Sequence, residues 1–582
     1  MKFIVATIFL ISLYQLPEKI CKFYNFKINI VQRYFGIALI LSFIYLINIY
    51  FLIFFSNSKF LNIFIFLLIL IYGFKIQDIK MKFIQIIHFL KKEKNNKSEI
   101  LIIIILILYF LISFIPLSDL DSLRYHMWLP KQIINHNFTS YITFDYLFFG
   151  ANEIINLFSL NLNFENFSSN INFLYLLAFY QCFNWYKEKK LIRNNIYILI
   201  FFSIPYFISL ISSQKLFLLP VFISSFSILY FFINYRKIGK IELIILDTLF
   251  FFIVCIKITF LPYLILYFLI KNFYLKNNFK ENCLIYFILS IIFIFPLIWF
   301  KFIFFGEPLI PFYVVNKANL EWLTPFKNYV LTYGYSDYFF LNFLKIFVPF
   351  NLSEIFQTLF PSIIALFFIN IKKNIKLIFV LFIFFLIPIL IFKNFQSRWF
   401  LPTIPLIAIL YDIQNRYHNI VKKLLILFLI FKIFFLTPIA LISFTSTISE
   451  KNKNIFLRNF SYGFEVAEFL KKEYPNQKII SNIENFYYIN EIIPIYSRKL
   501  DKNLIDQISF KKNFFDINLK NDEKFLIVLL DNKYSVNEIK NKFNLQNIKI
   551  LKNYNKNFEF SGRNFLIKSK SSITIFECLM KR

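Results

Sequence analysis

The chain alternates long apolar runs with short polar connections over roughly its first three quarters. The longest runs carry no charge for about 20 residues, the length that an α-helix needs to cross a bilayer core. The pattern predicts spans near 35–55, 59–74, 99–117, 171–184, 194–211, 215–234, 241–271, 282–304, 353–370, 376–392, 399–413 and 422–446, with 241–271 as a hairpin. The sequence thus predicts a polytopic α-helical membrane protein of roughly 11–14 transmembrane helices, and about 13 or 14 if every run and the first segment count.

The sequence pattern changes from about residue 448, where charged residues become more frequent and apolar runs shorten to the length of a strand. FEVAEFLKKEYP and VNEIKNKFN have the pattern of amphipathic helices, and KIISNI, KFLIVLLD, IKILKNY, NFLIKS and ITIFECL that of strands. We therefore expect three parts: N-terminal transmembrane segments with a basic loop at 1–98, a transmembrane core at 99–447, and a soluble C-terminal α/β domain at 448–582.

The distribution of basic residues predicts the orientation in the membrane. Residues 74–98 hold seven lysines, whereas residues 118–170 hold only Arg124 and Lys131 as basic residues. The positive-inside rule places the first segment in the cytoplasm and makes the second an external loop. The same alternation along the chain predicts that the C-terminal domain lies outside the cytoplasm, and we expect a bacterial inner (cytoplasmic) membrane.

Composition agrees with a membrane protein and argues against nucleic acid as a partner. The chain is 58% hydrophobic with a net charge of +31 and is rich in Lys, Asn, Ile, Phe and Tyr. Much of the basic charge lies in short loops between apolar runs, where it sets topology and favours anionic lipid headgroups. The five cysteines have no spacing typical of zinc or redox sites.

A cluster of ionisable residues follows the apolar run that ends near residue 117. The stretch SDLDSLRYHMWLPK contains Asp119, Asp121, Arg124, His126 and Lys131. A carboxylate at this position can act as a general base, and nearby cations can bind a phosphate. The simpler interpretation is a loop whose charges mark the membrane surface.

The same stretch resembles the first external loop of GT-C membrane glycosyltransferases, such as protein O-mannosyltransferases and aminoarabinose transferases. Asp121-Ser122-Leu123-Arg124-Tyr125 is similar to the family's Asp-Glu-x-x-Tyr/Phe motif, with Ser122 in place of the acidic second residue. GANEIINL at 150–157, SSQK at 212–215 and GEPLIPF at 306–312 resemble segments of a poorly described bacterial branch. QSRWFLP at 396–402 resembles the R-Y/F-x-L-P signature that opens a late span in many GT-C enzymes. The resemblance covers about residues 99–445, and three apolar segments precede the motif where the family usually has one.

The resemblance implies transfer of a sugar from a polyprenyl-phosphate donor to a lipid, glycan or protein acceptor at the external membrane face. Direct displacement by the acceptor would invert the anomeric carbon. Asp121 is the expected general base, with Asp119 as second choice or metal-side partner. Arg398, Lys215 and Arg124 are the expected phosphate ligands, although Lys215 and Arg398 could simply snorkel at span ends. The supporting residues are expected to be His126, Tyr125, Lys131 and Glu153.

Some roles stay open at the sequence level. No spacing of His and Asp predicts a metal site, no cofactor is certain, and a divalent cation is a possible addition. Glu153 could be only the polar face of an interfacial helix. Lys257, at the tip of the predicted hairpin, is interpreted as an interface anchor rather than a residue buried near the site. Rival functions are a polysaccharide polymerase or ligase, a lipid-linked sugar flippase or transporter, and a non-catalytic membrane scaffold.

Overall fold

The computed structural model is organised as two compact units. The first consists of residues 1–116, 150–300 and 331–450, and the second of residues 117–149, 301–330 and 451–582. The residues that the structure describes are 2–55, 58–75, 97–119, 121–134, 149–189, 196–275, 279–305, 308, 344, 358–360, 375–387, 397–410, 415–461, 463–475, 477, 479–481, 487–488, 492–494, 524–530, 536–542, 545–559 and 568–580.

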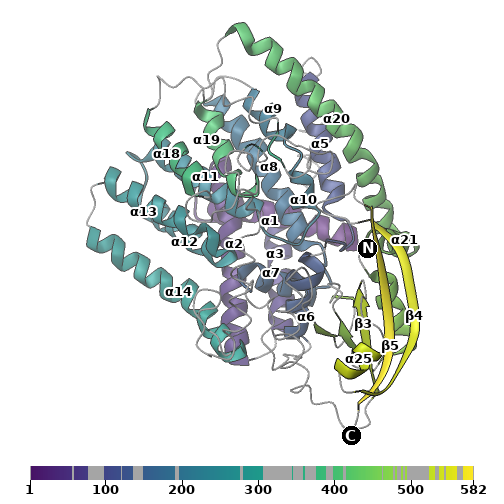
Figure 1. Cartoon of the computed structure of the whole chain (residues 1–582). Helices are drawn as coiled ribbons and strands as arrows, with labels where there is room; N and C mark the ends of the chain where they lie inside the picture. The colour runs from purple at the N-terminus through teal and green to yellow at the C-terminus, as the bar shows by residue number, and fades with distance from the viewer. Residues whose placement is uncertain are drawn as a thin grey trace. The chain divides into compact units, whose positions relative to one another are not determined.

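The first unit is helical (Figure 1). Five of the described helices are long and apolar enough to cross a membrane, within Phe3–Phe23, Ile30–Phe55, Ile258–Leu275, Phe279–Phe304 and Asn419–Ile448. The described helices that lie mainly in this unit are α1 (Lys2–Phe23), α2 (Ile30–Phe55), α3 (Lys59–Gly73), α5 (Lys97–Ile112), α7 (Ala151–Asn161), α8 (Phe167–Glu188), α9 (Ile196–Ser203), α10 (Phe207–Ile211), α11 (Leu218–Asn234), α12 (Lys240–Ile256), α13 (Leu261–Leu275), α14 (Phe279–Phe305), α18 (Ile375–Leu386), α19 (Thr403–Leu410) and α20 (Asn415–Ile448).

The described helices overlap the predicted apolar runs, but not all of them are single spans. The helix in 99–117 ends at Ile112, and 399–413 contains the end of a 3₁₀ turn (Ser397–Phe400) and the short helix α19. The run 194–211, predicted as a single span, is two short helices, α9 and α10, because Pro205 follows the end of α9 and cannot continue its hydrogen-bond ladder. The hairpin predicted over 241–271 is confirmed as α12 and α13, separated by Lys257 and the short 3₁₀ helix η4 (Ile258–Phe260). The predicted span 353–370 lies outside the described residues apart from 358–360.

The N-terminal helices pack within the same unit as the later ones. α2 contacts α1, α7, α8, α11 and α12. A Cβ atom on Gly73, the last residue of α3, would lie 2.5 Å from the Ser12 backbone oxygen of α1, so only glycine allows this approach. The Lys19 ammonium donates to the Gly73 carbonyl at 2.7 Å and satisfies the end of α3. Residues 2–73 are therefore part of the helical core.

Long helices meet through backbone carbonyls as well as apolar side chains. Figure 1 shows α20 as a long green helix beside α5, and the Ser443 hydroxyl of α20 donates to the Leu111 carbonyl of α5 at 2.7 Å. The buried Lys432 ammonium donates to the Phe202 and Ile204 carbonyls at 2.5 and 2.6 Å. These carbonyls belong to the C-terminal end of α9, where helix carbonyls lack intrahelical partners. Lys432 thus compensates for the break before α10.

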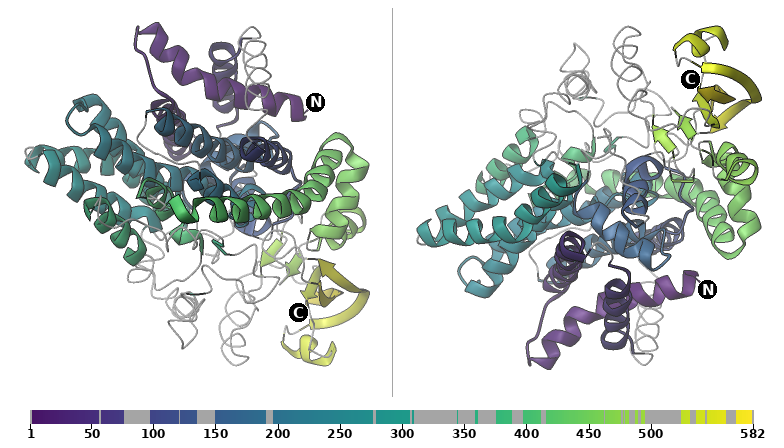
Figure 2. Two further views of the ribbon diagram at one scale, coloured as in Figure 1. Left: turned by 90° about the horizontal axis from the view of Figure 1, so that it is seen from above. Right: turned by 90° about the horizontal axis from the view of Figure 1, so that it is seen from below.

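α12, α13 and α14 form a neighbouring group of helices in all three views (Figures 1 and 2). The Lys271 ammonium of α13 contacts the Asp247 carboxylate of α12 at 2.6 Å, and both side chains are almost fully buried. The Cys255 thiol of α12 donates to the Phe293 carbonyl of α14 at 3.3 Å. A buried charge is tolerated when it is paired, so the ion pair fixes the two arms of the hairpin against each other.

The second unit contains a mixed five-stranded sheet. Its described strands are β1 (Ile479–Ser481), β2 (Ile492–Pro494), β3 (Lys524–Leu530), β4 (Leu545–Glu559) and β5 (Lys568–Met580), and its described helices are η2 (Ser122–His126), α6 (Trp128–Ile134), α21 (Glu450–Phe460), α22 (Phe464–Glu473) and α25 (Val536–Lys542). The strand order is β2-β1-β3-β5-β4. β1 is parallel to β2 and β3, whereas β5 is antiparallel to β3 and β4.

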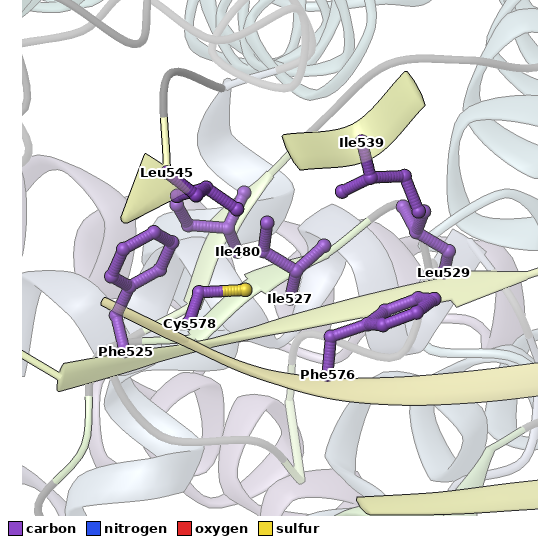
Figure 3. Packing of buried hydrophobic residues seen from close by; sticks show 8 residues of the cluster. All are labelled: Ile480, Phe525, Ile527, Leu529, Ile539, Leu545, Phe576 and Cys578. Atoms are coloured by element: carbon purple, nitrogen blue, oxygen red, sulfur yellow. The ribbon is translucent and has the colours of Figure 1, made fainter. Parts of the chain in front are cut away.

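Alternating apolar residues build the core of this sheet. Figure 3 shows side chains from the strands and from α25 packed together, a cluster that comprises Ile480, Phe525, Ile527, Leu529, Ile539, Leu545, Phe576 and Cys578. Because successive side chains of a strand point to opposite faces, every second residue of β3 enters this cluster. The predicted strands KIISNI, KFLIVLLD, IKILKNY and ITIFECL and both predicted helices are confirmed, β2 was not predicted, and most of NFLIKS lies outside the described residues.

The buried Cys578 thiol provides a test of this core. Burial, with a smaller contribution from the neighbouring Glu577 carboxylate, raises the pKa of the Cys578 thiol to about 12. Only the thiolate reacts rapidly with maleimides, so at pH 8 about one thiol in ten thousand would be reactive even if it were accessible. We expect mass spectrometry to find Cys578 unmodified after maleimide treatment at pH 8 and modified once urea unfolds the domain. Rapid labelling of the native protein would contradict this packing.

Candidate functional site

The stretch from Leu117 to Lys131, here called the aspartate loop, belongs to the second unit. Asp119 is buried, and its Oδ2 accepts hydrogen bonds from the Ser122 backbone N–H at 3.1 Å and the Ser122 hydroxyl at 2.9 Å. The Asp119 backbone oxygen also accepts from the Leu123 N–H at 3.0 Å. This is the bonding pattern of a helix N-cap. Asp119 therefore organises the turn that contains Asp121.

Asp121 lies at the start of an unusual helical turn. Its backbone is helical, with φ −65° and ψ −34°, and it precedes the π-helix η2. The Met127 N–H donates to the Ser122 carbonyl at 3.0 Å, which is the five-residue spacing of a π-helix. Such turns are rare and occur frequently at functional sites. The Asp121 side chain is half-buried, in contrast to Asp119.

The predicted residues Arg124, Tyr125 and His126 lie within this turn. The Tyr125 and His126 rings pack against each other with their centroids 4.2 Å apart, and both side chains are half-buried. Arg124 lies within η2, but its side chain is outside the described part of the structure. The prediction that Arg124 binds phosphate therefore stays a prediction.

Tyr487 and Tyr488, which come late in the chain, make three hydrogen bonds with the aspartate loop. The Lys131 ammonium donates to the Tyr487 carbonyl at 2.6 Å and lies 5.2 Å from the centroid of that tyrosine ring. The Tyr487 N–H donates to the Leu123 carbonyl at 3.0 Å, and the Tyr488 hydroxyl donates to the Leu117 carbonyl at 3.1 Å. Lys131, predicted as a supporting residue, thus has a described role in positioning the loop.

In the first unit, amide and hydroxyl side chains build a buried network around the segment 212–217. The Gln214 side-chain oxygen accepts from the Ser168 and Ser169 N–H groups at 3.2 and 3.4 Å, and its amide donates to the Ser169 hydroxyl at 2.9 Å. The Gln214 carbonyl accepts from the side-chain amides of Asn152 and Asn156 at 3.3 and 3.1 Å. Gln214 is therefore bound from both α7 and α8.

Asn172 of α8 completes this network. Its amide donates to the Leu210 and Lys215 carbonyls at 2.9 and 2.5 Å. Its oxygen accepts from the Phe217 and Leu218 N–H groups at 3.0 and 3.1 Å, which are orphan donors at the start of α11. Because the segment is buried, its backbone groups depend on these partners in place of water. The network fixes the backbone on both sides of Lys215.

Glu153 is buried and belongs to the same network. Its carboxylate accepts from the Gly150 N–H at 2.7 Å, which caps α7, and from the Asn152 side-chain amide at 2.9 Å. A Cβ on Gly150 would lie 2.6 Å from the Cys255 carbonyl, so glycine brings the start of α7 against the end of α12. Glu153 is thus an interior residue and not the exposed face of an interfacial helix.

Trp399 is the centre of a cation–aromatic cluster that also contains Phe217, Lys257 and Arg398. The Lys257 ammonium lies 4.8 Å from the Trp399 ring and 5.5 Å from the Phe217 ring, and the Arg398 guanidinium carbon lies 5.1 Å from the Trp399 ring. The two aromatic rings pack edge to face at 5.7 Å. Both cations are attracted by ring quadrupoles at these distances.

The cluster brings together residues that are distant in sequence. Phe217 follows Lys215 by two residues, Lys257 ends α12, and Arg398 and Trp399 lie in the 3₁₀ helix η9 (Ser397–Phe400). Lys215 is 9% exposed. Lys257, interpreted from the sequence as an interface anchor, lies over the aromatic rings of this cluster, and its role as an anchor stays a prediction. Two cations thus share the Trp399 ring.

The predicted site residues divide between the two units. Asp119, Asp121, Arg124, Tyr125, His126 and Lys131 lie in the second unit, whereas Glu153, Lys215 and Arg398 lie in the first. Within each unit the structure groups the predicted residues as described above. The motif GEPLIPF is outside the described residues except Pro308. Among the described residues, no three His, Cys, Asp or Glu side chains are grouped as metal ligands, and the divalent cation stays a prediction.

Sequence reasoning missed the polar network and the position of Lys257. A usable signal was present, since Asn152 and Asn156 are four residues apart in α7, and Ser168 and Asn172 are four apart in α8. Residues at this spacing share one helix face. Polar side chains on one face of apolar helices indicate a buried interaction.

No protein-family model, no curated protein and no solved structure matches the chain.

We predict that Asn172→Ala destabilises the first unit by on the order of 2–4 kcal/mol, because four buried backbone groups lose their partner. The matched control is Asn234→Ala, since Asn234 is half-buried and, among the described residues, its amide donates to the Tyr230 carbonyl of its own helix. The measurement is the thermal unfolding temperature of the purified protein. Equal shifts for the two variants would contradict a special role for Asn172.

We predict that Lys131→Met and Tyr488→Phe each loosen the aspartate loop. Each variant removes a hydrogen bond worth about 1 kcal/mol, so hydrogen exchange of the backbone amides at 122–127 should accelerate about fivefold. Tyr474→Phe, in the same unit, is the control and should leave this exchange unchanged. Unaltered exchange in both test variants would show that the contacts with Tyr487 and Tyr488 do not hold the loop.

Proposed function

We propose that the protein is an integral membrane glycosyltransferase. It transfers a sugar from a polyprenyl-phosphate donor to a lipid, glycan or protein acceptor at the external face of a bacterial inner membrane. The proposal combines the resemblance of the aspartate loop to GT-C enzymes with the helical, apolar character of the first unit. It also retains the predicted exterior location of the C-terminal sheet domain.

The observation that carries the proposal is the different environment of the two aspartates. Asp119 is buried and bound twice by Ser122, so its carboxylate serves the turn. Asp121 is half-buried on a π-helical turn that this cap and the Tyr487 N–H hold in place. A general base must reach its substrate and be held in a fixed direction. We therefore assign the base to Asp121 and a positioning role to Asp119.

The proposed reaction is a direct displacement. The acceptor hydroxyl oxygen forms a bond to the anomeric carbon while Asp121 accepts the hydroxyl proton. The bond between the anomeric carbon and the phosphate oxygen breaks, its electron pair stays on that oxygen, and polyprenyl phosphate leaves. Attack opposite the leaving group inverts the anomeric centre. His126 and Tyr125 are proposed to support Asp121.

The leaving group determines what else the site needs. The phosphate is a monoanion as a diester in the donor and becomes a dianion as bond cleavage proceeds. Cations that bind the dianion more strongly than the monoanion lower the barrier. Lys215 and Arg398 are the proposed ligands, supported by the buried network that fixes Lys215 and by the stacking of Arg398 on Trp399. Arg124 is a further proposed ligand.

A lipid-linked sugar flippase is the second candidate function, because buried charges inside membrane helices often mark transport pathways. Asp247 and Lys271 form such a pair, and Lys432 is a further buried cation. Each of these cations contacts a carboxylate or backbone carbonyl of a neighbouring helix. These contacts favour structural ties and make transport the weaker proposal.

We predict that Asp121→Asn lowers sugar transfer by at least about 100-fold, since general-base catalysis typically contributes that much or more. The assay measures transfer of radiolabelled sugar from polyprenyl-phosphate donors in membranes that contain the folded variant. Asp119→Asn retains a capping side chain and should keep most activity, whereas Asp119→Ala should lose part of it.

Two outcomes would overturn these assignments. Loss of transfer with Asp119→Asn, but not with Asp121→Asn, would place the base at Asp119. Absence of transfer by the wild type with every donor would refute the transferase and favour a test of lipid translocation.

A further inference from the structure

We propose that the side of β4 that faces away from β5, here called the β4 edge, binds an extended acidic segment of another protein. The segment adds a strand to the sheet and carries an acidic side chain at every second position. This inference concerns the second unit alone and does not rest on the proposed function. It follows from the length of the edge, from a bulge in β4 and from the lysines that the bulge aligns.

β4 is the last strand at one end of the sheet, and it is long. In the order β2-β1-β3-β5-β4 it borders β5, and among the described strands it borders no other. Figure 1 shows β4 and β5 as two long yellow strands side by side. β4 has 15 residues, more than twice the mean strand length of about 5–6 residues. Alternate N–H and C=O groups of an edge strand point away from the sheet, so such an edge can template another extended chain.

A β-bulge aligns two lysines of β4 on one face of the sheet. Lys549 pairs with Glu577 of β5 and Lys552 pairs with Ile575, with a register shift between Ile550 and Lys552. Glu577 and Ile575 are two residues apart in β5 and therefore share a face. Lys549 and Lys552 share the same face although they are three residues apart, because the bulge inserts one residue. Without the bulge, the two lysines would lie on opposite faces.

This face of the sheet is basic even after its ion pair is counted. Lys549 and Lys552 are both exposed. The carboxylate of Glu577, opposite Lys549, also lies 3.7 Å from the Lys524 ammonium of β3. Three lysines therefore share one glutamate around this part of the sheet. Acidic side chains of a partner would find an electrostatically complementary surface here.

Aromatic rings hold one of the two lysines in place beside the edge. The Lys552 ammonium lies 4.5 Å from the centroid of the Phe469 ring of α22 and 4.8 Å from that of the Tyr554 ring of β4. The two rings pack against each other at 6.3 Å. A cation that is already positioned loses less side-chain freedom when a carboxylate binds it.

The spacing of the lysines specifies the sequence of the partner. Lys549 and Lys552 occupy pairing positions two residues apart, or about 7 Å at about 3.4 Å per residue. Side chains i and i+2 of an extended peptide have the same spacing and share a face. An added strand with acidic residues at i and i+2 would therefore place its carboxylates beside the two lysines, while its backbone binds the β4 edge.

The charges of β4 disfavour a second copy of the same chain as the partner. β4 contains three lysines and one glutamate. Antiparallel pairing of two copies of β4 would bring their lysines together on one face, where like charges repel. Lysines on edge strands protect sheets from pairing with like strands. The same lysines attract an acidic strand, so the β4 edge is selective for the charge of its partner.

The test measures peptide binding by the full-length protein in phosphatidylcholine nanodiscs. The probe is a fluorescent peptide of about ten residues in which Thr and Glu alternate, and the readout is fluorescence anisotropy. One comparison peptide has Lys in place of Glu, and another has the probe sequence with N-methylated amides, which cannot donate to a strand. We expect the Thr-Glu peptide to bind at least about tenfold more tightly than either comparison peptide.

The test variant is Lys549→Gln/Lys552→Gln, which should weaken binding of the Thr-Glu peptide about tenfold through loss of both charged contacts. The matched control is Lys451→Gln/Lys471→Gln, which removes two exposed lysines of α21 and α22 in the same unit. The control should bind the peptide like the wild type.

A second measurement uses the wild type alone, so that folding of a variant does not limit the result. The Thr-Glu peptide should slow hydrogen exchange of the backbone amides at 548–554 severalfold and leave those of α25 unchanged, because an added strand binds the N–H groups of the β4 edge.

Several outcomes would overturn the proposal. Equal binding of the N-methylated peptide, or equal losses in the two double variants, would show that charge alone attracts the peptide. Wild-type affinity in Lys549→Gln/Lys552→Gln, or no binding of the Thr-Glu peptide, would refute the site. Slower exchange at 548–554 in phosphatidylglycerol nanodiscs without peptide would make an anionic membrane the partner. None of these measurements requires sugar transfer.

Discussion

The structure of the first unit depends on satisfying backbone polar groups where water is excluded. A buried connection between helices leaves carbonyl and N–H groups without helical partners, and each unpaired group is costly. Here Asn172 binds four such groups on the two sides of Lys215, and Gln214 receives N–H groups from α8. Phe217 follows directly, so the same bonds determine where its ring meets Trp399. The position of the Phe217 ring in the cation–aromatic cluster therefore depends on the amide network.

In the aspartate loop, too, a buried polar side chain binds backbone groups. The half-buried Asp121 precedes a turn that the buried carboxylate of Asp119 closes. Ser122 donates to the Asp119 carboxylate twice, from its backbone N–H and from its hydroxyl. Asp119 thus closes the turn from a position two residues before Asp121.

Sequence could predict the elements of this protein better than their connections. Long apolar runs predicted the helices because length and hydrophobicity determine them, and short apolar runs predicted β3 and β5. The π-helix at Ser122–His126 was not predictable, since it depends on the cap of Asp119 and the contact of Tyr487, which is distant in sequence. The position of Lys257 depends on three separate segments meeting at Trp399. No local pattern encodes such a meeting.

The buried cations illustrate how one residue type serves two purposes in one helical unit. Lys432 and Lys271 each lie against oxygen acceptors that a neighbouring helix supplies, a backbone end and a carboxylate. Their charge is compensated where they stand, and moving them would leave those acceptors unpaired. The Lys257 ammonium lies over the Phe217 and Trp399 rings, so these contacts differ in kind from the oxygen contacts of the other two lysines.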